Sequence, residues 1–427
     1  MPSWTRRHWL ATSTAVVAGA GLVLRPSDEG GTHDAYFAKL QRAMQAGPAM
    51  PTLVVDSQRF RANLTKVAST VSPGLALRVV VKSLPSLELV KEALTAWMTH
   101  KVMVFNAPQL LSIAQAMPQA DVLLGKPFPV SAAKWVLEKT AGTSFNAARQ
   151  VQWLIDTPAR AAQYKELAQA MNLPLRLNLE IDVGLHRGGL ESDPALVDVL
   201  KVIQSHPGLQ FSGMMGYDAH VAAIPDLPGL RRKAMDHAQA AYAARVAAAR
   251  THLGAAWPSA GLTFNTGGSL TYHLHDSTHA ANEVSVGSAT VKPLDFEKPS
   301  TAELQAASFI ATPVLKAMGA FRLPVGVEAI SDAAAWWDRN QSQAFAIHGG
   351  HWLAQAVSPP GVQASSLYGA SSNQQVMVAS KTVSLQPDDW VMFRPRQSEA
   401  VFLQFGAIAV FDGERISARW PVFEASA

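Results

Sequence analysis

Residues 75–82 read Leu-Ala-Leu-Arg-Val-Val-Val-Lys, an apolar run that closes on a lysine. Its β-branched residues predict a buried strand, and Lys82 would then project from the carboxyl end of that strand. In a (β/α)8 barrel this rim carries the catalytic groups. A lysine desolvated there among apolar side chains would give up its proton more easily and could attack a carbonyl to form a Schiff base. The alternative is a solvated lysine at the start of a loop, and position alone favours it.

Strands and helices alternate on both sides of this run. Further strands are expected over residues 51–56, 101–105, 121–124, 175–182 and 211–217, and helices over 57–68, 86–98, 107–116 and 233–253. Repeated strand–helix units of this length predict a parallel sheet with helical crossovers. We therefore expect an α/β protein built on a (β/α)8 barrel.

The pattern changes after about Pro299. Short β-rich segments follow, separated by Gly, Pro, Asp and Ser, over residues 309–317, 343–348, 375–379, 390–393, 401–410 and 416–422. They predict an antiparallel β domain. The expected organisation is thus a leader and linker over residues 1–35, the barrel over 36–298 and a carboxyl-terminal β domain over 299–427.

The composition excludes several classes of function. The 427 residues include no cysteine, which excludes thiolate catalysis, disulfides and cysteine metal sites. The formal net charge is only +4 and the basic residues are scattered, so nucleic-acid binding is not supported. Nearly half of the residues are hydrophobic, which allows a large core.

The amino terminus has the pattern of an export signal. Arg6 and Arg7 precede an apolar stretch over residues 11–24 that contains small residues suited to cleavage. This is a twin-arginine pattern, and we expect the twin-arginine export machinery to deliver the protein to the periplasm. The absence of cysteine suits an oxidising compartment. The alternative is an uncleaved leader that tethers the protein to the membrane, or a disordered one.

Four segments carry groups suited to one cofactor. Residues 78–83 bring Lys82, residues 180–189 bring Arg187 at the end of a strand, and residues 213–220 bring Tyr217 and His220. Residues 266–271 read Thr-Gly-Gly-Ser-Leu-Thr, a glycine turn before a possible helix whose free N–H groups would bind a phosphate. An amine, a cation, an aromatic ring and a phosphate cradle are the groups needed to hold pyridoxal phosphate.

In their order and their residue sequences, these segments resemble the fold-type III pyridoxal-phosphate enzymes. The resemblance is to the D-threonine aldolase and D-serine dehydratase branch of the alanine-racemase-like barrel, and it runs from about Thr52 to Val422. Residues 121–127 and 410–413 also match. The resemblance implies a pyridoxal phosphate cofactor, a small amino-acid substrate and a homodimer.

The resemblance also implies roles for single residues. Lys82 would form the Schiff base with the cofactor and later act as a base at the substrate Cα. Arg187 would lie near the phenolic oxygen or the ring of the cofactor, although an ion pair with Asp182 or Glu180 is the alternative. Tyr217 would contact the cofactor or else be a core aromatic residue. The turn formed by Gly267, Gly268 and Ser269 would hold the phosphate.

The sequence departs from the family pattern at three places, one of which is residues 372–375, Ser-Asn-Gln-Gln, where the family has an acidic residue and a histidine. Val79 and Val80 replace a Pro-His pair before the lysine, and Gln397 and Glu399 replace the late pair of metal ligands. Glutamine is a poor zinc ligand and one carboxylate is not a site, so we expect no metal. Glu399 is then the candidate acid–base group toward the substrate.

Paired histidines do not change this expectation. The pair His273 and His275 with His279, and the pair His348 and His351, have a spacing that zinc tolerates, but paired histidines without a known further ligand are more often surface or hydrogen-bonded residues. His351 falls in a stretch that matches the active-site side of the family's β domain. We therefore treat His351 as a catalytic candidate.

The leading function is a lyase that acts on D-configured β-hydroxy amino acids, by retro-aldol cleavage or by loss of water. One alternative is an amino-acid racemase, which needs a second acid opposite Lys82. Four residues were candidates for that acid: Tyr272, Tyr368, His220 and His351. The other alternative is an exported binding protein that kept the fold but not the catalysis.

Overall fold

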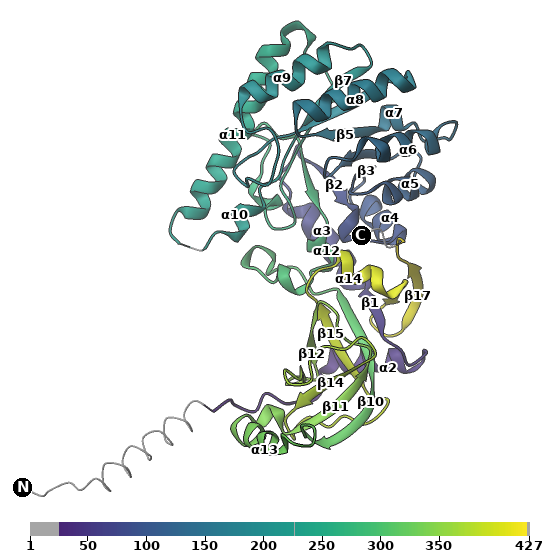
Figure 1. Ribbon diagram of the computed structural model, residues 1–427, viewed down its shortest axis with the longest axis vertical. Helices are drawn as coiled ribbons and strands as arrows, with labels where there is room; N and C mark the ends of the chain where they lie inside the picture. Colours follow the sequence, from purple (N-terminus) through teal and green to yellow (C-terminus); the bar gives the residue numbers. More distant parts are fainter. Residues whose placement is uncertain (1–24, 226, 425–427) are drawn as a thin grey trace, which may run out of the picture. The chain divides into compact units, whose positions relative to one another are not determined.

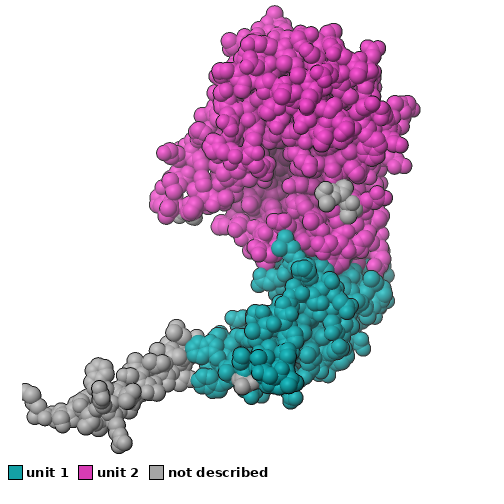
Figure 2. Space-filling view, viewed as in Figure 1, with its two compact units in different colours: residues 1–54, 309–395, 413–416 teal, residues 55–308, 396–412, 417–427 magenta. Residues whose placement is uncertain are grey.

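The computed structural model describes residues 25–225 and 227–424. The chain forms two compact units. Unit 1 comprises Met1–Val54, Phe309–Pro395 and Gly413–Ile416, and unit 2 comprises Val55–Ser308, Arg396–Asp412 and Ser417–Ala427 (Figure 2). The predicted export signal with Arg6 and Arg7 lies outside the described residues. In the part of the chain that is described, no helix is long and apolar enough to cross a bilayer.

Unit 2 contains a closed barrel of eight strands. They are β2 (Ala76–Val80), β3 (Lys101–Val104), β4 (Asp121–Leu124), β5 (Val151–Ile155), β6 (Leu175–Glu180), β7 (Leu209–Gly216), β8 (Thr263–Thr266) and β9 (Glu283–Val286). Neighbouring strands run parallel, with Val79 opposite Val102 in β3 and Ala76 opposite Glu283 where β9 closes the barrel on β2. The predicted (β/α)8 barrel is confirmed.

Helices precede, connect or follow these strands and surround the barrel (Figure 1). They are α3 (Ser57–Thr70), α4 (Leu87–Ala96), α5 (Ala107–Ala116), α6 (Val130–Thr140), α7 (Ala147–Gln150), α8 (Pro158–Met171), α9 (Asp193–Gln204), α10 (Ala219–Ala223), α11 (Leu230–Leu253) and α12 (Ser288–Val291). Local sequence determines where several begin. Thr157, for example, accepts a hydrogen bond from the Arg160 N–H and is followed by a proline, the usual start of a helix.

Unit 1 contains an antiparallel sheet, as predicted. Its strands are β10 (Ser308–Ala320), β11 (Gln343–His348), β12 (Ala354–Ser358), β13 (Gln363–Ala364), β14 (Gln374–Ala379) and β15 (Trp390–Pro395). They follow the order β13–β14–β11–β10, and β15 pairs with both β10 and β12. The unit also holds helices α2 (Ala35–Gln45) and α13 (Glu328–Trp337).

The two units divide the chain differently from the predicted domains. Residues 36–54, expected in the barrel domain, lie in unit 1, and β1 (Thr52–Asp56) is not a barrel strand. Residues 396–412 and 417–427, expected in the β domain, lie in unit 2. Here the predicted strand over 401–410 is partly wrong. Helix α14 (Glu399–Phe402) and a 3-10 turn, η7 (Leu403–Phe405), come first, and the strand β16 (Ala407–Phe411) then precedes β17 (Ile416–Pro421).

Apolar burial and an ion pair hold residues 396–402 in unit 2. Val401 and Phe402 of α14 are buried. Just before them, the Arg396 side chain binds the Asp295 carboxylate at 2.8 Å, and the Asp295 N–H donates to the Arg396 carbonyl. These contacts place Glu399 in the same unit as Lys82.

Candidate active site

A cavity of about 170 Å³ opens in unit 2 at the residues that end or follow the barrel strands. Its lining includes Lys82, Ser83, Phe105, Arg187, Tyr217, Asn265, Gly267, Gly268, Ser269, Ser285, Ser288 and Glu399. Because these residues come at or near the carboxyl ends of parallel strands, the cavity occupies the face at which barrel enzymes carry their chemistry.

Lys82 lies on η1 (Val81–Ser83), a single 3-10 turn after β2, so the strand ends two residues earlier than the predicted run. Its Nζ lies 4.8 Å from the centre of the Phe105 ring and 3.7 Å from Glu399 Oε1. The expectation of a desolvated amine is wrong for this structure, because 44% of the side chain is exposed to the open cavity. The amine is therefore accessible to a ligand.

Glu399 is held by two serines. Ser288 donates to Ser83 Oγ at 2.8 Å, and Ser83 donates to Glu399 Oε1 at 3.1 Å, while Ser288 also lies within 3.4 Å of the same oxygen. The hydroxyls and the Lys82 amine converge on one carboxylate oxygen. Lys82 and Glu399 therefore line one cavity and lie within ion-pair distance of each other.

Arg187 and Tyr217 form a second wall of the cavity. The Arg187 guanidinium lies 5.0 Å from the centre of the Tyr217 ring. The Asp182 carboxylate instead accepts hydrogen bonds from the Gly184 and His186 N–H groups, and its Oδ2 lies 2.6 Å from Nδ1 of the His186 ring. Among residues 25–225 and 227–424 no ion pair joins Arg187 to Asp182 or Glu180, so the alternative role weighed for this arginine is not observed. Burial raises the pKa of Tyr217 despite the nearby guanidinium.

The glycine turn follows β8 directly. Gly267 has a φ of 69°, and a Cβ on Gly268 would come within 2.7 Å of the Tyr217 ring, so both positions require glycine. The predicted helix after the turn is only a 3-10 turn, η3 (Tyr272–Leu274). The N–H groups of Thr271 and Tyr272 donate to the Gly268 carbonyl, but within the described chain those of Gly268 and Ser269 have no acceptor. A bound anion could accept from them.

A hydrogen-bonded cluster behind the turn fixes its position. Asp218 accepts a hydrogen bond from Thr271 Oγ1 at 2.6 Å and binds His275 Nε2 at 2.7 Å, and all three residues are buried. Sequence reasoning missed this anchor. Its signal was present in residues 213–220, where Asp218 directly follows Tyr217, but the histidine that it binds comes more than fifty residues later. The arrangement holds the turn beside Tyr217.

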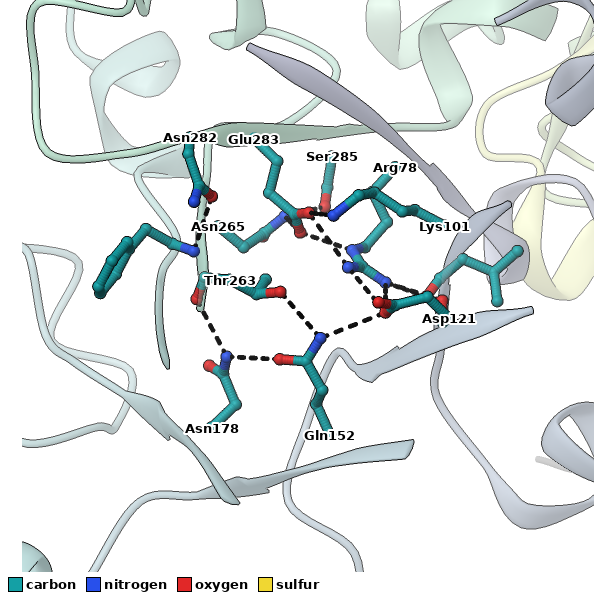
Figure 3. A network of polar contacts seen from close by, with 12 residues as sticks. Arg78, Lys101, Asp121, Gln152, Asn178, Thr263, Asn265, Asn282, Glu283 and Ser285 are labelled. Carbon is teal, nitrogen blue, oxygen red and sulfur yellow. Dashed lines mark hydrogen bonds and ion pairs between the residues drawn. The ribbon is translucent and has the colours of Figure 1, made fainter. Parts of the chain in front are cut away.

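Beneath the rim, the barrel interior carries a charged network (Figure 3). Arg78 is fully buried and binds Glu283 Oε1 at 2.6 Å and Asp121 Oδ1 at 3.1 Å, while Lys101 binds Glu283 Oε2 at 2.8 Å. Asn265 connects Glu283 to Ser285, which lines the cavity. The sequence analysis treated Arg78 only as part of a strand and missed the network.

The remaining candidates are not among the residues that line the cavity. His351 belongs to unit 1, in the loop after β11, where its N–H donates to Gln375 Oε1 at 2.8 Å, and its catalytic role stays a prediction. In unit 2, His220 does not line the cavity, and burial lowers the pKa of its ring. Of the histidines with zinc-like spacing, His275 binds Asp218 and His279 binds Asp276. Over the described ranges no group of three metal-ligating side chains occurs.

Comparison with known families agrees with this geometry. The family profile described as alanine racemase, N-terminal domain, matches residues 55–293, which is more than half of the chain and covers the whole barrel. The chain belongs to this family. A search of curated proteins finds no match.

Solved structures with the alanine racemase fold cover most of the chain. D-threo-3-hydroxyaspartate dehydratase from Delftia sp. HT23 is 15% identical with a TM-score of 0.68, covering 90% of this chain and 99% of its own. D-threonine aldolase from Filomicrobium marinum is 18% identical with a TM-score of 0.67, covering 88% and 96%. Alanine racemase from Bartonella henselae with covalently bound pyridoxal phosphate is 17% identical with a TM-score of 0.59, covering 82% and 92%. At these identities the likeness shows the fold alone.

Pyridoxal phosphate is the cofactor of this alanine racemase-like protein, and the residues present fit it. The Lys82 amine is accessible for a covalent bond to the cofactor carbonyl. The free amides of Gly268 and Ser269 suit the phosphate, and the ring of Tyr217 with the Arg187 cation suits an anionic aromatic ring. Each group lines the same cavity.

Proposed function

We propose that the protein is a pyridoxal-phosphate lyase that acts on D-configured β-hydroxy amino acids, and that loss of water is its main reaction. The observation that carries the proposal is the 3.7 Å separation between the Lys82 amine and the Glu399 carboxylate in one cavity. A base and an acid side by side can remove a proton from one carbon and protonate a leaving group on the next. The D configuration is carried over from the names of the similar dehydratase and aldolase.

Two residues of this chain would move the protons. When bound, pyridoxal phosphate draws electrons away from the bonds at the substrate Cα. The Lys82 amine takes the Cα proton and passes it across the short gap to Glu399. Glu399 then protonates the β-hydroxyl, which leaves as water when its bond to Cβ breaks. No proton is gained or lost in this sequence, and both groups return to their starting state.

The serines beside Glu399 would select the β-hydroxyl. Ser83 and Ser288 form a compact polar cluster with Glu399 Oε1 next to the lysine. A substrate hydroxyl there could form a hydrogen bond to Glu399 or to a serine, whereas the methyl group of alanine could not. Sites that hydrogen-bond a substrate hydroxyl discriminate against the analogue that lacks it. The cluster therefore supports a β-hydroxy amino acid over alanine.

Retro-aldol cleavage is the other lyase reaction that the same pair supports. Glu399 as a carboxylate would take the proton of the β-hydroxyl, the bond between Cα and Cβ would break, and Lys82 would return a proton to Cα. Product analysis separates the two reactions.

The racemase alternative has less support. Reprotonation on the opposite face needs a second acid in the cavity. Of the four candidates, Tyr272 and His220 in unit 2 do not line the cavity, and in unit 1 the Tyr368 hydroxyl donates to the Arg322 carbonyl. His351 stays a candidate. A racemase would therefore need that histidine or a group from a second copy of the chain.

The test uses the holoenzyme with D-serine, D-threonine and D-alanine. We expect 2-oxo acids and ammonia from the first two amino acids and no reaction with D-alanine. Glycine with an aldehyde would indicate the aldolase reaction instead. Conversion of D-alanine to its enantiomer without lyase products would overturn the proposal in favour of a racemase, and no reaction with any amino acid would favour the non-catalytic binding protein.

Assembly and location are proposals of the same kind. We propose a homodimer, as is common in the family, and export to the periplasm through the pair Arg6 and Arg7. Replacing both arginines by lysine keeps the charge but removes the guanidinium groups that the export receptor reads. The double variant should then stay in the cytoplasm, and normal periplasmic delivery would contradict the proposal.

A further inference from the structure

Helix α13 presents large apolar side chains to solvent. It comes between β10 and β11 in the chain and belongs to unit 1 (Figure 1). On this helix Trp336 is 62% exposed, Ile330 54% and Trp337 40%, and in the turn before it Val325 is 95% exposed. Apolar side chains exposed together mark a surface that meets a partner or a membrane.

A hydrogen bond on the opposite side of α13 fixes this orientation. Ser331 is buried, and its Oγ accepts from the Leu323 N–H at 2.7 Å. Successive helical residues are turned by about 100°, so Ile330, Trp336 and Trp337 all lie roughly 100° or more around the helix from Ser331. Rotating α13 to bury the tryptophans would break the bond to Ser331. The outward apolar face is therefore a built feature of unit 1.

The described chain begins at this same face. The guanidinium of Arg25 lies 5.3 Å from the centre of the Trp336 ring, and its Nε donates to the Trp337 carbonyl at 3.0 Å. In the sequence, Arg25 directly follows residues 11–24, the apolar stretch of the expected export leader. The segment that is expected to enter a membrane is thus joined to unit 1 beside the two exposed tryptophans.

The charges around this face cancel. Three cations and three carboxylates occur in residues 322–339 together with the first described residue: Arg25, Arg322, Arg339, Glu328, Asp332 and Asp338. A region without net charge has no electrostatic preference for an anionic partner. Whatever covers this face is therefore recognised mainly through its apolar character.

We propose that the outward face of α13 binds the surface of a lipid bilayer, with Ile330, Trp336 and Trp337 at the level of the headgroups. An indole ring is mostly apolar but carries one N–H donor, so tryptophan gathers at the boundary between acyl chains and water. A helix whose apolar face enters this boundary lies in the plane of the membrane. Such binding holds the enzyme at the membrane that the leader enters, whichever reaction it catalyses.

The chain contains no cysteine, so a single introduced cysteine can carry a fluorescent label at a chosen point of the full-length protein. Ala333→Cys places a polarity-sensitive label on the exposed side of α13. With phosphatidylcholine vesicles, we expect its emission to move to shorter wavelength and to be quenched by a spin-labelled lipid. An unchanged emission would overturn the proposal. None of these measurements needs turnover, so a failed lyase assay would leave them standing.

Helix α6 of the barrel offers a matched control position. Ser131 is exposed and precedes the exposed Trp135 by four residues, just as Ala333 precedes Trp337. A label on Ser131→Cys should keep the emission that it has in water when the same vesicles are added. An equal change at the two positions would mean that the chain adsorbs to lipid without using α13, and would overturn the proposal.

Variants separate the contribution of α13 from that of the leader. In the labelled Ala333→Cys protein, Trp336→Ser together with Trp337→Ser should abolish most of the emission shift, even where the leader still holds the chain on the vesicle. Trp135→Ser should leave the shift as it was. The outward side chains carry little packing, so the variants should fold. A full shift without the two tryptophans would overturn their role in binding.

Two conditions distinguish other causes of the same shift. Because the charges cancel, adding phosphatidylglycerol to the vesicles or raising the salt to about 0.5 M should change the shift little. A shift seen only with the anionic lipid would overturn the apolar basis of the binding.

A second copy of the chain is the other occupant that fits an apolar face. The proposal predicts that, without vesicles, the emission of the label stays the same at every protein concentration. A shift that grows with protein concentration in the absence of lipid would assign the face to an interface between copies, and would overturn the proposal.

Discussion

The rim and the interior of the barrel use charge in different ways. At the rim, Lys82 and Glu399 lie 3.7 Å apart with 44% and 28% of their side chains exposed. In the interior, Arg78 and Glu283 lie 2.6 Å apart and neither side chain is exposed. An exposed pair gains little stability and is free to exchange protons, whereas a buried pair is fixed and becomes costly once one partner is removed. The rim is therefore suited to catalysis and the interior to holding the rim in place.

Removing the rim lysine should have the largest effect on activity. Lys82→Ala should lower turnover by roughly 10³-fold or more, because both the covalent anchor and the base are lost, and should abolish the visible absorption of covalently bound cofactor. The thermal midpoint of the apoprotein should barely change, since the side chain is exposed. Lys134→Ala, which breaks only a surface pair with Glu138, is the control. Retention of the absorption band in Lys82→Ala would show that Lys82 is not the residue that binds the cofactor covalently.

Removing the interior carboxylate should instead affect stability most. Glu283→Gln leaves Arg78 and Lys101 without their shared partner, and loss of one member of a buried pair costs about 3–5 kcal/mol. The free energy of unfolding measured in urea should fall by that amount. Glu92→Gln, which breaks an exposed pair with Arg61, should cost less than about 1 kcal/mol. Equal losses of unfolding free energy in the two variants would show that the buried ion pairs contribute no more to stability than the exposed pair.

The same contrast explains what the sequence could predict. Several rim residues come in local segments that match a family pattern, such as residues 180–189 and 266–271, so they could be named as candidates without knowing the fold, whereas Phe105 and Ser288 were missed. The interior residues are single polar positions on separate strands. Glu283 and Ser285 lie on β9, a strand that the alternation of segments did not predict individually, and they meet Arg78 only through the register of β9 on β2. Register across two hundred residues cannot be deduced from local pattern.

Glu399 is an intermediate case. It became a candidate because the sequence departs there from the family pattern, but it was expected in the β domain, between strands over residues 390–393 and 401–410. It is instead the first residue of a short helix in unit 2, because the buried Val401 and Phe402 fix that segment there. The exposure of Lys82 was also misjudged, since strand pattern does not show how open the rim is.

Glu399→Gln should test the catalytic part of the rim alone. The amide keeps the size and can still accept from Ser83, but it cannot exchange a proton, so turnover should fall by roughly 10²-fold. Cofactor absorption and the unfolding midpoint should stay as in the wild type. A loss of cofactor without a specific loss of turnover would make Glu399 a structural residue.

Lowering the pH should test how much Glu283 contributes to the free energy of unfolding without a mutation. The pKa of Glu283 is lowered below its ordinary value of 4.5, because Arg78 and Lys101 outweigh burial. Its contribution to stability is therefore complete above about pH 4.5 and is lost as the pH falls through the lowered value. Urea unfolding at a series of acidic pH values should show a steeper decline for the wild type than for Glu283→Gln. Parallel curves would contradict this linkage.

The central claim, that Lys82 and Glu399 move protons between neighbouring carbon and oxygen atoms, is tested most directly with D-serine that carries deuterium at Cα. Product NMR on the holoenzyme should show pyruvate and ammonia, with the deuterium released to solvent and no L-serine. Deuterium retained at Cα in glycine would instead assign the aldolase reaction to the same pair of residues. Accumulation of L-serine that has lost its deuterium, without pyruvate or glycine, would contradict the account.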